Sequence, residues 1–397
     1  MRLQNKGLLA ERGRRSGRRD PETWALYGLL GLVGYLLTAL GATLAPLQRD
    51  LDVSRAQVAL YPSLFAAGLL VIGVAGTAVV SRTGRVVYSR LALLLMAVGA
   101  LALCSGNRPL TMAGAALLGL GAAAVVQLVP AALTETHGDA ASTALGEANA
   151  LSSAAAVAGP LCVGAAIGLG AGWRAGFLVL PLVAAVALAP LTRHLSPAAP
   201  VPDAGDPPDA VAVDQHGDDR PLLGVWFNLL LAISIEFCVV FWAPEALIDW
   251  HDAGAGLAAA LAGSFVLGMA AVRAGSARLL AGRDPQRVTA ASALIAMAGF
   301  AAFWAGPDLL VAAIGLVVLG AGIALLYPVT VALVVAAWPA RPDAAAGRAA
   351  LASALAVGGT PLALAGAAEV VGLRPAYLLV PALLGLLLAR ACHTVRR

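Results

Sequence analysis

One acidic residue stands far from any aqueous boundary that the sequence predicts. Glu236 is the only charged residue between Arg220 and Glu245, and it lies about fourteen residues from either end of an apolar span expected over 222–249. A carboxylate at that depth costs roughly 2.5 to 3.5 kcal/mol on insertion scales. We therefore expect Glu236 to face a cavity, where it binds a proton or a cargo molecule. The alternative is a protonated glutamic acid that is hydrogen-bonded to a backbone carbonyl.

Arg273 is the other charged residue that lies well inside an expected span, 254–280. It lies about seven residues from the end expected to face the cytoplasm, and snorkelling of the guanidinium to that interface is the favoured interpretation. The alternative is a cavity-facing cation that binds an anionic substrate or faces Glu236. A rise of about 1.5 Å per residue places the two residues about 10 Å apart in depth. The sequence thus argues against a direct contact.

Neutral polar side chains near the middle of other spans are candidate cargo contacts, because buried polar groups on cavity helices can bind a solute. The candidates for the substrate cavity are Tyr35, Thr38, Gln127, Asn228, Trp242 and Tyr327. Gln127 and Tyr327 lie 200 positions apart, each close to a proline. Each of these side chains is equally well explained as an interhelical hydrogen bond that holds membrane helices together.

The composition places these residues in a membrane protein. Apolar residues make up 60% of the 397 residues and charged residues only 12%, against roughly 25% charged in an ordinary soluble domain. Twelve apolar spans are expected, and each should be a helix because a segment in lipid must satisfy its own backbone hydrogen bonds. Ser54 and Gln57 predict a capping box at the start of the second span. The spans are 23–47, 55–81, 87–105, 108–134, 145–171, 174–192, 222–249, 254–280, 286–306, 308–337, 344–371 and 373–390.

The sequence repeats itself in the same direction at an offset of about 200 residues. Matching pairs include Phe65 and Phe265, Gly119 and Gly320, Ser153 and Ser353, Gly159 and Gly359, and Arg174 and Arg374. Parallel repeats of this length predict two similar six-helix halves, related by an axis along the membrane normal. The expected parts are a basic N-terminus (1–22), a first half (23–192), a linker (193–221), a second half (222–390) and a tail (391–397).

Basic residues predict the orientation. With the N-terminus inside, 20 Lys and Arg fall on the inner side and 5 on the outer side, as the positive-inside rule requires. Both termini and the linker are expected in the cytoplasm, in a multi-pass protein of the inner cell membrane.

The inventory of reactive residues argues against an enzyme. Lys6 is the only lysine, so a GxxxxGK phosphate loop is absent. All five histidines fall in loops or at span ends, without the spacing of a zinc site. We expect no catalytic residues, no metal, no cofactor and no nucleic-acid partner.

Two local motifs point to a family. Arg82, Gly84 and Arg85 follow the second span in the segment TAVVSRTGRV, which resembles the GxxxDRxGRR motif of the major facilitator superfamily. Ser81 stands where that motif has Asp. Gly159, Pro160 and Gly164 resemble the antiporter motif GxxxGPxxGG in the fifth span. In its high Ala, Gly and Arg content the chain is also similar to actinobacterial-type permeases.

The resemblance implies a secondary transporter with the fold of that superfamily: all-α, with twelve transmembrane helices in two parallel repeats. It assigns a gating or interface role to these motif residues. A positive-inside anchor is the alternative for the arginines, and ordinary tight packing is the alternative for the glycines and the proline. Gly164, Gly168 and Gly172 also follow one helix face, which predicts that a neighbouring helix approaches closely.

The favoured function is proton-coupled export of a small organic compound by alternating access, with protons as partners and the protein as a monomer. The first alternative is uptake of a sugar or another small nutrient by symport or facilitated diffusion. The second is a membrane receptor or scaffold that does not transport.

Overall fold

The computed structural model describes residues 20–196, 220–337 and 342–395, and the regular structure in these ranges is helical. The first group of helices is α2 (Pro21–Leu51), α3 (Arg55–Val58), α4 (Leu60–Leu103), α5 (Arg108–His137), the short η1 (Gly138–Ala140), α6 (Ala141–Gly168), α7 (Gly172–Leu191) and η2 (Thr192–His194). The second group is α8 (Arg220–His251), α9 (Ala255–Ala274), α10 (Ser276–Leu280), α11 (Pro285–Ala305), α12 (Leu309–Ile323), α13 (Leu326–Ala337), α14 (Pro342–Val371), α15 (Leu373–Ala376) and α16 (Leu379–Val395).

Among the described residues, eleven helical segments are long and apolar enough to cross a membrane. One of them, Arg55–Leu103, has 49 residues, which at 1.5 Å per residue is more than twice the roughly 30 Å of a hydrocarbon core. Its backbone is non-helical at Gly84, where φ is 76° and ψ is 161°, a conformation that glycine adopts readily. The kink divides this segment into two spans, so the all-α fold with twelve spans that the sequence predicts is confirmed.

Local capping chemistry sets where several helices begin. The Ser54 side chain accepts a hydrogen bond from Gln57 N, and the Gln57 side chain accepts one from Ser54 N, which confirms the predicted capping box. The carboxylates of Asp284 and Asp308 cap α11 and α12 in the usual way, each accepting the backbone N–H three residues later. These caps satisfy backbone donors that would otherwise lack partners at the helix starts.

The repeat in the sequence corresponds to a repeat of contacts. A side-chain carbon at Gly119 would collide with the carbonyl of Phe65, and one at Gly320 would collide with the carbonyl of Phe265. Only glycine lets α5 lie this close to α4, and only glycine lets α12 lie this close to α9. Within the described ranges, the two non-glycine residues with positive φ are Asp52 (50°) and Asp252 (51°), again 200 positions apart.

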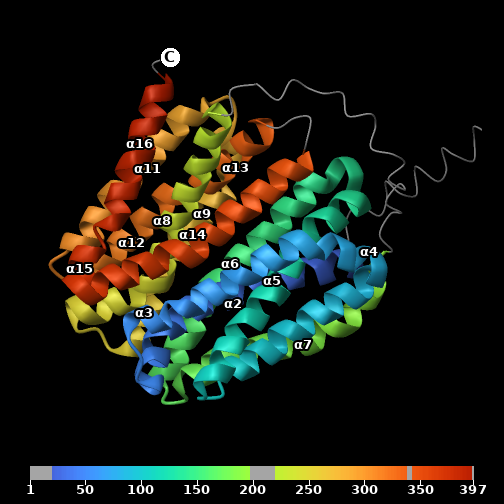
Figure 1. Cartoon of the computed structure of the whole chain (residues 1–397), viewed down its shortest axis with the longest axis horizontal. Helices are drawn as coiled ribbons and strands as arrows, with labels where there is room; N and C mark the ends of the chain where they lie inside the picture. The colour runs from blue at the N-terminus through green and yellow to red at the C-terminus, as the bar shows by residue number, and fades with distance from the viewer. Residues whose placement is uncertain (1–19, 197–219, 338–341, 396–397) are drawn as a thin grey trace, which may run out of the picture.

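The helices form two bundles. We call α2–α7 the N-terminal bundle and α8–α16 the C-terminal bundle; Figure 1 shows the first in blue to green and the second in yellow to red. The bundles meet mainly through α6 with α9, α4 with α14 and α2 with α8, with smaller contacts of α3 with α14 and α2 with α9. The arrangement is symmetric. At the repeat offset α6 corresponds to α14 and the first part of α4 corresponds to α9, so α6–α9 and α4–α14 are equivalent pairs, and α2 pairs with its own counterpart α8.

Small residues allow the α6–α9 contact. A side-chain carbon at Gly164 would lie 2.5 Å from Gly256 O, and one at Gly256 would lie 3.0 Å from Gly168 N. The predicted close approach is therefore confirmed at Gly164, whereas a side-chain carbon at Gly168 would meet no atom within contact distance. It is wrong for Gly172, because α6 ends at Gly168 and the chain turns before Gly172, which has φ 77° and nothing within contact distance.

Polar contacts between the bundles gather at one end, which we call the closed end and define by Asp52 and Asp252, where the chain leaves α2 and α8. There Arg55 Nε lies 2.5 Å from Glu245 Oε1, and Ala56 N donates to Glu369 Oε1 at 3.1 Å. Slightly deeper, Ser63 Oγ donates to Gly358 O at 2.6 Å. At the opposite end the described residues show no comparable closure, since neither α5 nor α6 packs extensively against α13 or α14.

Candidate functional site

An ion pair joins two charged residues that lie deep within their spans. Arg273 Nη2 donates to Glu236 Oε2 at 3.2 Å, and the side chains are 32% and 15% exposed. The expectation that these residues do not touch is wrong. Counted from the turn at 252–254, which both helices share, they differ by only about three residues, or roughly 5 Å of rise. The long arginine side chain reaches back to Glu236 and does not snorkel away from it.

A proline supplies the second anchor of Arg273. Its Nε donates to Ala324 O at 3.3 Å, between α12 and α13. In an uninterrupted helix that carbonyl would accept the N–H of residue 328, but residue 328 is proline and has no N–H. The guanidinium therefore occupies a hydrogen-bonding position that the sequence itself leaves open. It links α9 to the break between α12 and α13.

Tyr327 lies beside the pair. It is three residues after Ala324, which places the two residues on neighbouring positions of one helix face, and it is close enough to interact electrostatically with both Glu236 and Arg273. Its side chain is 41% exposed although it belongs to a membrane-spanning segment. We call Glu236, Arg273 and Tyr327 the charged triad.

The triad lies on the side of the C-terminal bundle that faces the other bundle. Glu236 is one helical turn before Val240, and the carbonyl of Val240 lies against Gly41 of α2, so closely that a side-chain carbon there would collide with it. The repeat counterpart of Arg273 is Gly73, which lies near Ala350 of α14 in the opposite bundle. Both comparisons place the ion pair next to the interface between the bundles, about halfway along α8.

Four other predicted cavity residues make hydrogen bonds within their own bundle. The Tyr35 hydroxyl donates to Gly176 O, and Thr38 Oγ1 donates to Ala156 O at 2.7 Å. Trp242 is fully buried and donates to Pro361 O at 3.1 Å, whereas Asn228 Oδ1 accepts from Arg390 Nε at 2.5 Å. Each bond ties one helix of a bundle to another. Contact of these four residues with cargo stays a prediction.

Gln127 lies 200 positions before Tyr327, in the N-terminal bundle. Its Oε1 accepts from the Tyr88 hydroxyl at 2.9 Å, and its Nε2 donates to Thr77 Oγ1 at 3.2 Å. The amide is thus bonded at both ends, and the structure does not bring it together with the triad.

The motif residues after the second span have distinct places. Gly84 forms the kink of α4, and the buried Arg85 pairs with Glu135 of α5, its Nη2 lying 2.5 Å from Glu135 Oε1. Arg82 is exposed. Arg85 thereby ties the two spans of α4 to the end of α5. A gating role for these residues stays a prediction.

The fifth-span motif, on α6, lies between α2 and α9. A side-chain carbon at Gly159 would collide with α2 near Tyr35 and Ala39, whereas Pro160 and Gly164 face α9 of the other bundle. Pro160 Cβ lies 3.4 Å from where a side-chain carbon of Gly263 would be. The motif therefore takes part in the contact between the bundles, and its role in transport stays a prediction.

Sequence reasoning missed the groups at the closed end. Arg55 also approaches Asp249, its Nη2 lying 3.6 Å from Asp249 Oδ1, and the partner Glu245 is buried. Nothing in the spacing of these residues links α3 to α8. The repeat offset gives the only signal, because residues 55 and 245 both lie within about seven residues of the equivalent turns at 52 and 252.

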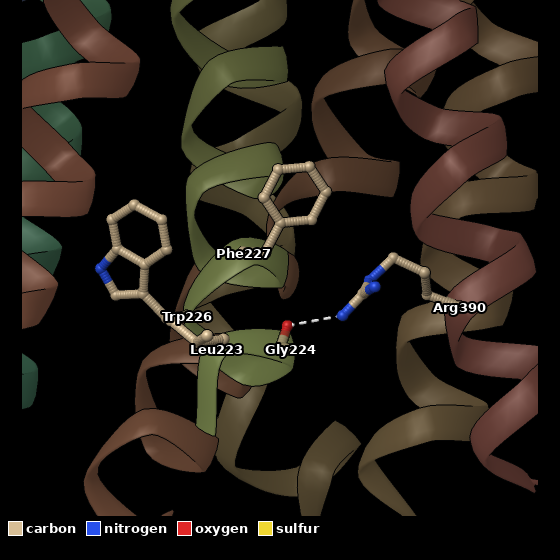
Figure 2. A pocket seen from close by; sticks show the side chains of 5 residues that line it. All are labelled: Leu223, Gly224, Trp226, Phe227 and Arg390. Carbon is tan, nitrogen blue, oxygen red and sulfur yellow. Dashed lines mark hydrogen bonds between the residues drawn. The ribbon is translucent and has the colours of Figure 1, made fainter. Parts of the chain in front are cut away.

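A separate hollow lies at the end opposite the closed end (Figure 2). Leu223, Gly224, Trp226, Phe227 and Arg390 line about 450 Å³ between α8 and α16. Arg390 extends from α16 and donates to Gly224 O at 2.7 Å, with its guanidinium carbon 5.4 Å from the centre of the Phe227 ring. This hollow is distinct from the triad.

The comparisons with known proteins agree with this architecture. The model of the Major Facilitator Superfamily matches residues 26–361. The chain belongs to the major facilitator superfamily. This assignment makes it a multi-pass membrane protein of a transporter family and not an enzyme, as the sequence predicts.

Solved structures of the superfamily share the fold. A bacterial homologue of the human lysosomal transporter Spinster, inward-facing and occupied, aligns over 96% of this chain and 98% of its own, with TM-score 0.70 and 15% identity. The human organic anion transporter MFSD10 (TETRAN) aligns over 94% and 100%, with TM-score 0.68 and 17% identity.

The xylose transporter XylE from E. coli, partially occluded and inward open, aligns over 93% and 96%, with TM-score 0.73 and 14% identity. No curated protein sequence matches the chain. At these identities the structures show a common fold and leave the cargo open.

Proposed function

We propose that this protein is a proton-coupled secondary transporter of a small organic compound, in which Glu236 binds the proton. The observation that supports this most directly is the Glu236–Arg273 pair beside the interface of the bundles. A carboxylate at this depth is costly unless it is paired or protonated. The carboxylate therefore has two stable forms, one bonded to Arg273 and one carrying a proton.

Protonation of Glu236 changes the contacts at the interface. A neutral carboxylic acid loses the charge–charge attraction to the guanidinium, which at about 3 Å is strong in a medium of low dielectric constant. The proton thus releases Arg273, which is bonded to the break between α12 and α13. This gives a physical route from proton binding to a rearrangement of helices next to the opposite bundle.

Alternating access supplies the transport cycle. The bundles are held together at the closed end by Arg55 with Glu245 and by Ser63 with Gly358, and the described residues lack similar packing between α5 or α6 and α13 or α14. With the closed end outside, as the positive-inside rule predicts, this conformation is open towards the cytoplasm. We place the protein in the inner cell membrane as a monomer, with both termini in the cytoplasm.

The ion pair favours symport over antiport. A transporter exchanges cargo for protons when the two compete for one group. Here protonation of Glu236 frees Arg273, so the site can bind cargo and a proton at the same time. Uptake by symport is therefore the direction that the site supports best. Export by antiport is the second candidate, and the position of Pro160 and Gly164 at the α6–α9 contact favours it, since these residues resemble the antiporter motif.

Reconstituted protein tests both directions. We expect counterflow of a compound from a panel of sugars, organic acids and amines in proteoliposomes, with proton movement coupled to it across an imposed pH gradient. Proton entry with cargo means symport, and proton movement against cargo means antiport. If no compound in the panel gives counterflow, the result would instead favour a receptor or scaffold that does not transport.

A substitution tests the assigned proton site. Glu236→Gln removes the titratable group while keeping its shape, so we expect counterflow to continue and proton coupling to disappear. Asp308→Asn is the matched control, because asparagine also caps a helix and the change removes an acid far from the triad. Unaltered pH dependence in Glu236→Gln would remove Glu236 from the mechanism.

A further inference from the structure

The charged triad has several hydrogen-bonding groups left over. In the described part of the chain, Arg273 uses Nε and Nη2, so its Nη1 has no partner, and the Tyr327 hydroxyl makes no hydrogen bond. Glu236 uses only Oε2. Polar groups within a membrane span are normally satisfied, and Tyr327 is 41% exposed. Arg273 Nη1 and the Tyr327 hydroxyl are therefore two free donors beside the break between α12 and α13. A hydrogen-bond acceptor on a ligand would satisfy both.

The charge of the triad restricts what that ligand is. With Glu236 ionised and Arg273 protonated, the net charge is zero. Binding an anion alone gives minus one and binding a proton alone gives plus one, and each uncompensated charge is costly in a low-dielectric span. Binding both together leaves the net charge at zero. Proton and anion therefore favour each other's binding.

We propose that the cargo carries a single negative charge on a carboxylate or similar group, which Arg273 binds while Tyr327 donates to it and Glu236 holds the proton. The proton passes from water to a Glu236 oxygen on loading and returns to water on release, and no other bond forms or breaks. This inference rests on the proposed function and names the class of compound that the same site accepts.

Other charge classes fit the triad less well. A cationic cargo would add a positive charge beside Arg273, which is held in place by Ala324 O. A neutral cargo, such as a sugar, would leave the ion pair intact and would bind without a proton. The number of protons taken up on binding therefore reports the charge of the cargo.

Matched probes test the charge preference directly. Benzoate, benzamide and benzylamine share a ring and differ in charge at neutral pH, and butyrate, butyramide and butylamine do the same without a ring. Each is titrated into the purified full-length protein in weakly buffered detergent solution. Thermal stabilisation reports binding, and a pH indicator reports protons. We expect a carboxylate to bind with uptake of about one proton, and the amide and amine to bind at least 10-fold more weakly.

Three variants connect this signal to the triad. Tyr327→Phe removes one donor and should weaken carboxylate binding about 10-fold, since hydrogen bonds to charged groups are the strong ones. Arg273→Lys keeps the positive charge but loses the paired N–H donors of the guanidinium, so carboxylate affinity should fall 10- to 100-fold. Glu236→Gln should still bind the carboxylate, with no proton uptake and no dependence on pH. Tyr61→Phe and Arg287→Lys are the controls, because Tyr61 bonds Thr111 in the other bundle and Arg287 lies at the start of α11.

The outcomes separate this inference from the proposed function. If amides or amines bind more tightly than carboxylates, if no carboxylate binds, or if carboxylates bind without protons, the anionic cargo is excluded. Proton-coupled counterflow of a sugar or an amine would at the same time keep the proposed function. Equal carboxylate binding by wild type, Tyr327→Phe and Arg273→Lys would show that the probe binds outside the triad, and it would overturn the proposal.

Discussion

The two bundles share a frame of close contacts and differ at the charged triad. The same close contacts occur in both, as at Gly119 with Phe65 and at Gly320 with Phe265. The C-terminal bundle has Glu236, Arg273 and Tyr327, and 200 positions earlier the N-terminal bundle has Leu36, Gly73 and Gln127. The frame is kept by residues that allow close packing, whereas at these three positions only the C-terminal bundle carries charge. Duplication thus explains the architecture, and the chemistry lies where the copies differ.

Removal of the arginine should have the largest effect on this asymmetry. Arg273→Ala leaves Glu236 without its cation, and breaking a partly buried pair costs about 2 to 3 kcal/mol, so transport should fall roughly 100-fold. Gly73→Ala is the equivalent change in the other bundle. A carbon there would lie 3.9 Å from Ala350 Cβ, an ordinary contact, and counterflow should stay near the wild-type rate. Similar losses in both variants would contradict the assignment of function to one bundle.

The shared frame should respond equally in both bundles. Gly119→Ala and Gly320→Ala each force a methyl group against a backbone carbonyl, so each should lower the free energy of unfolding by about 1 to 3 kcal/mol. Thermal unfolding in detergent measures this. Gly366→Ala is the control, because nothing lies within contact distance of that position. A large effect in only one of the first two variants would argue against equivalent contacts.

The contact between the bundles at the closed end should give the smallest effect. Arg55→Ala removes a partly exposed ion pair, worth about 0.5 to 1 kcal/mol, and should lower the ratio of closed to open molecules about two- to five-fold. Oxidative cross-linking between cysteines introduced at Ser63 and Gly358 measures that population. Arg287→Ala, far from this interface, should leave cross-linking unchanged. Undiminished cross-linking in Arg55→Ala would mean that helix packing alone keeps this end closed.

The fold could be read from the sequence because its causes are local or periodic. Apolar length predicts the spans, and the capping box at Ser54 and Gln57 needs only residues three apart. The repeat offset predicts pairs of contacts such as those at Gly119 and Gly320. Gly172 was assigned to the wrong face because a helical face was extended past the end of α6 at Gly168.

The candidate site could be read only in part. The cost of burying a carboxylate is enough to single out Glu236. Its pairing with Arg273 depends on the relative depth of α8 and α9, and counting residues from the expected span ends gives the wrong depth. For Tyr35 and Trp242 the sequence does not distinguish two roles, because a polar group within a span is equally suited to bind cargo or a neighbouring helix. The Arg55–Glu245 pair joins residues 190 positions apart, and no local pattern encodes it.

Pro328 has a consequence for the order of events at the triad. Because proline carries no backbone N–H, residue 328 never competes with Arg273 for Ala324 O, whatever the protonation of Glu236. The bond from Arg273 Nε can therefore persist while its Nη groups exchange partners. The guanidinium then acts as a pivot with one fixed point. It turns between the carboxylate of Glu236 and the carboxylate of the cargo. After each turnover it returns to the same starting position.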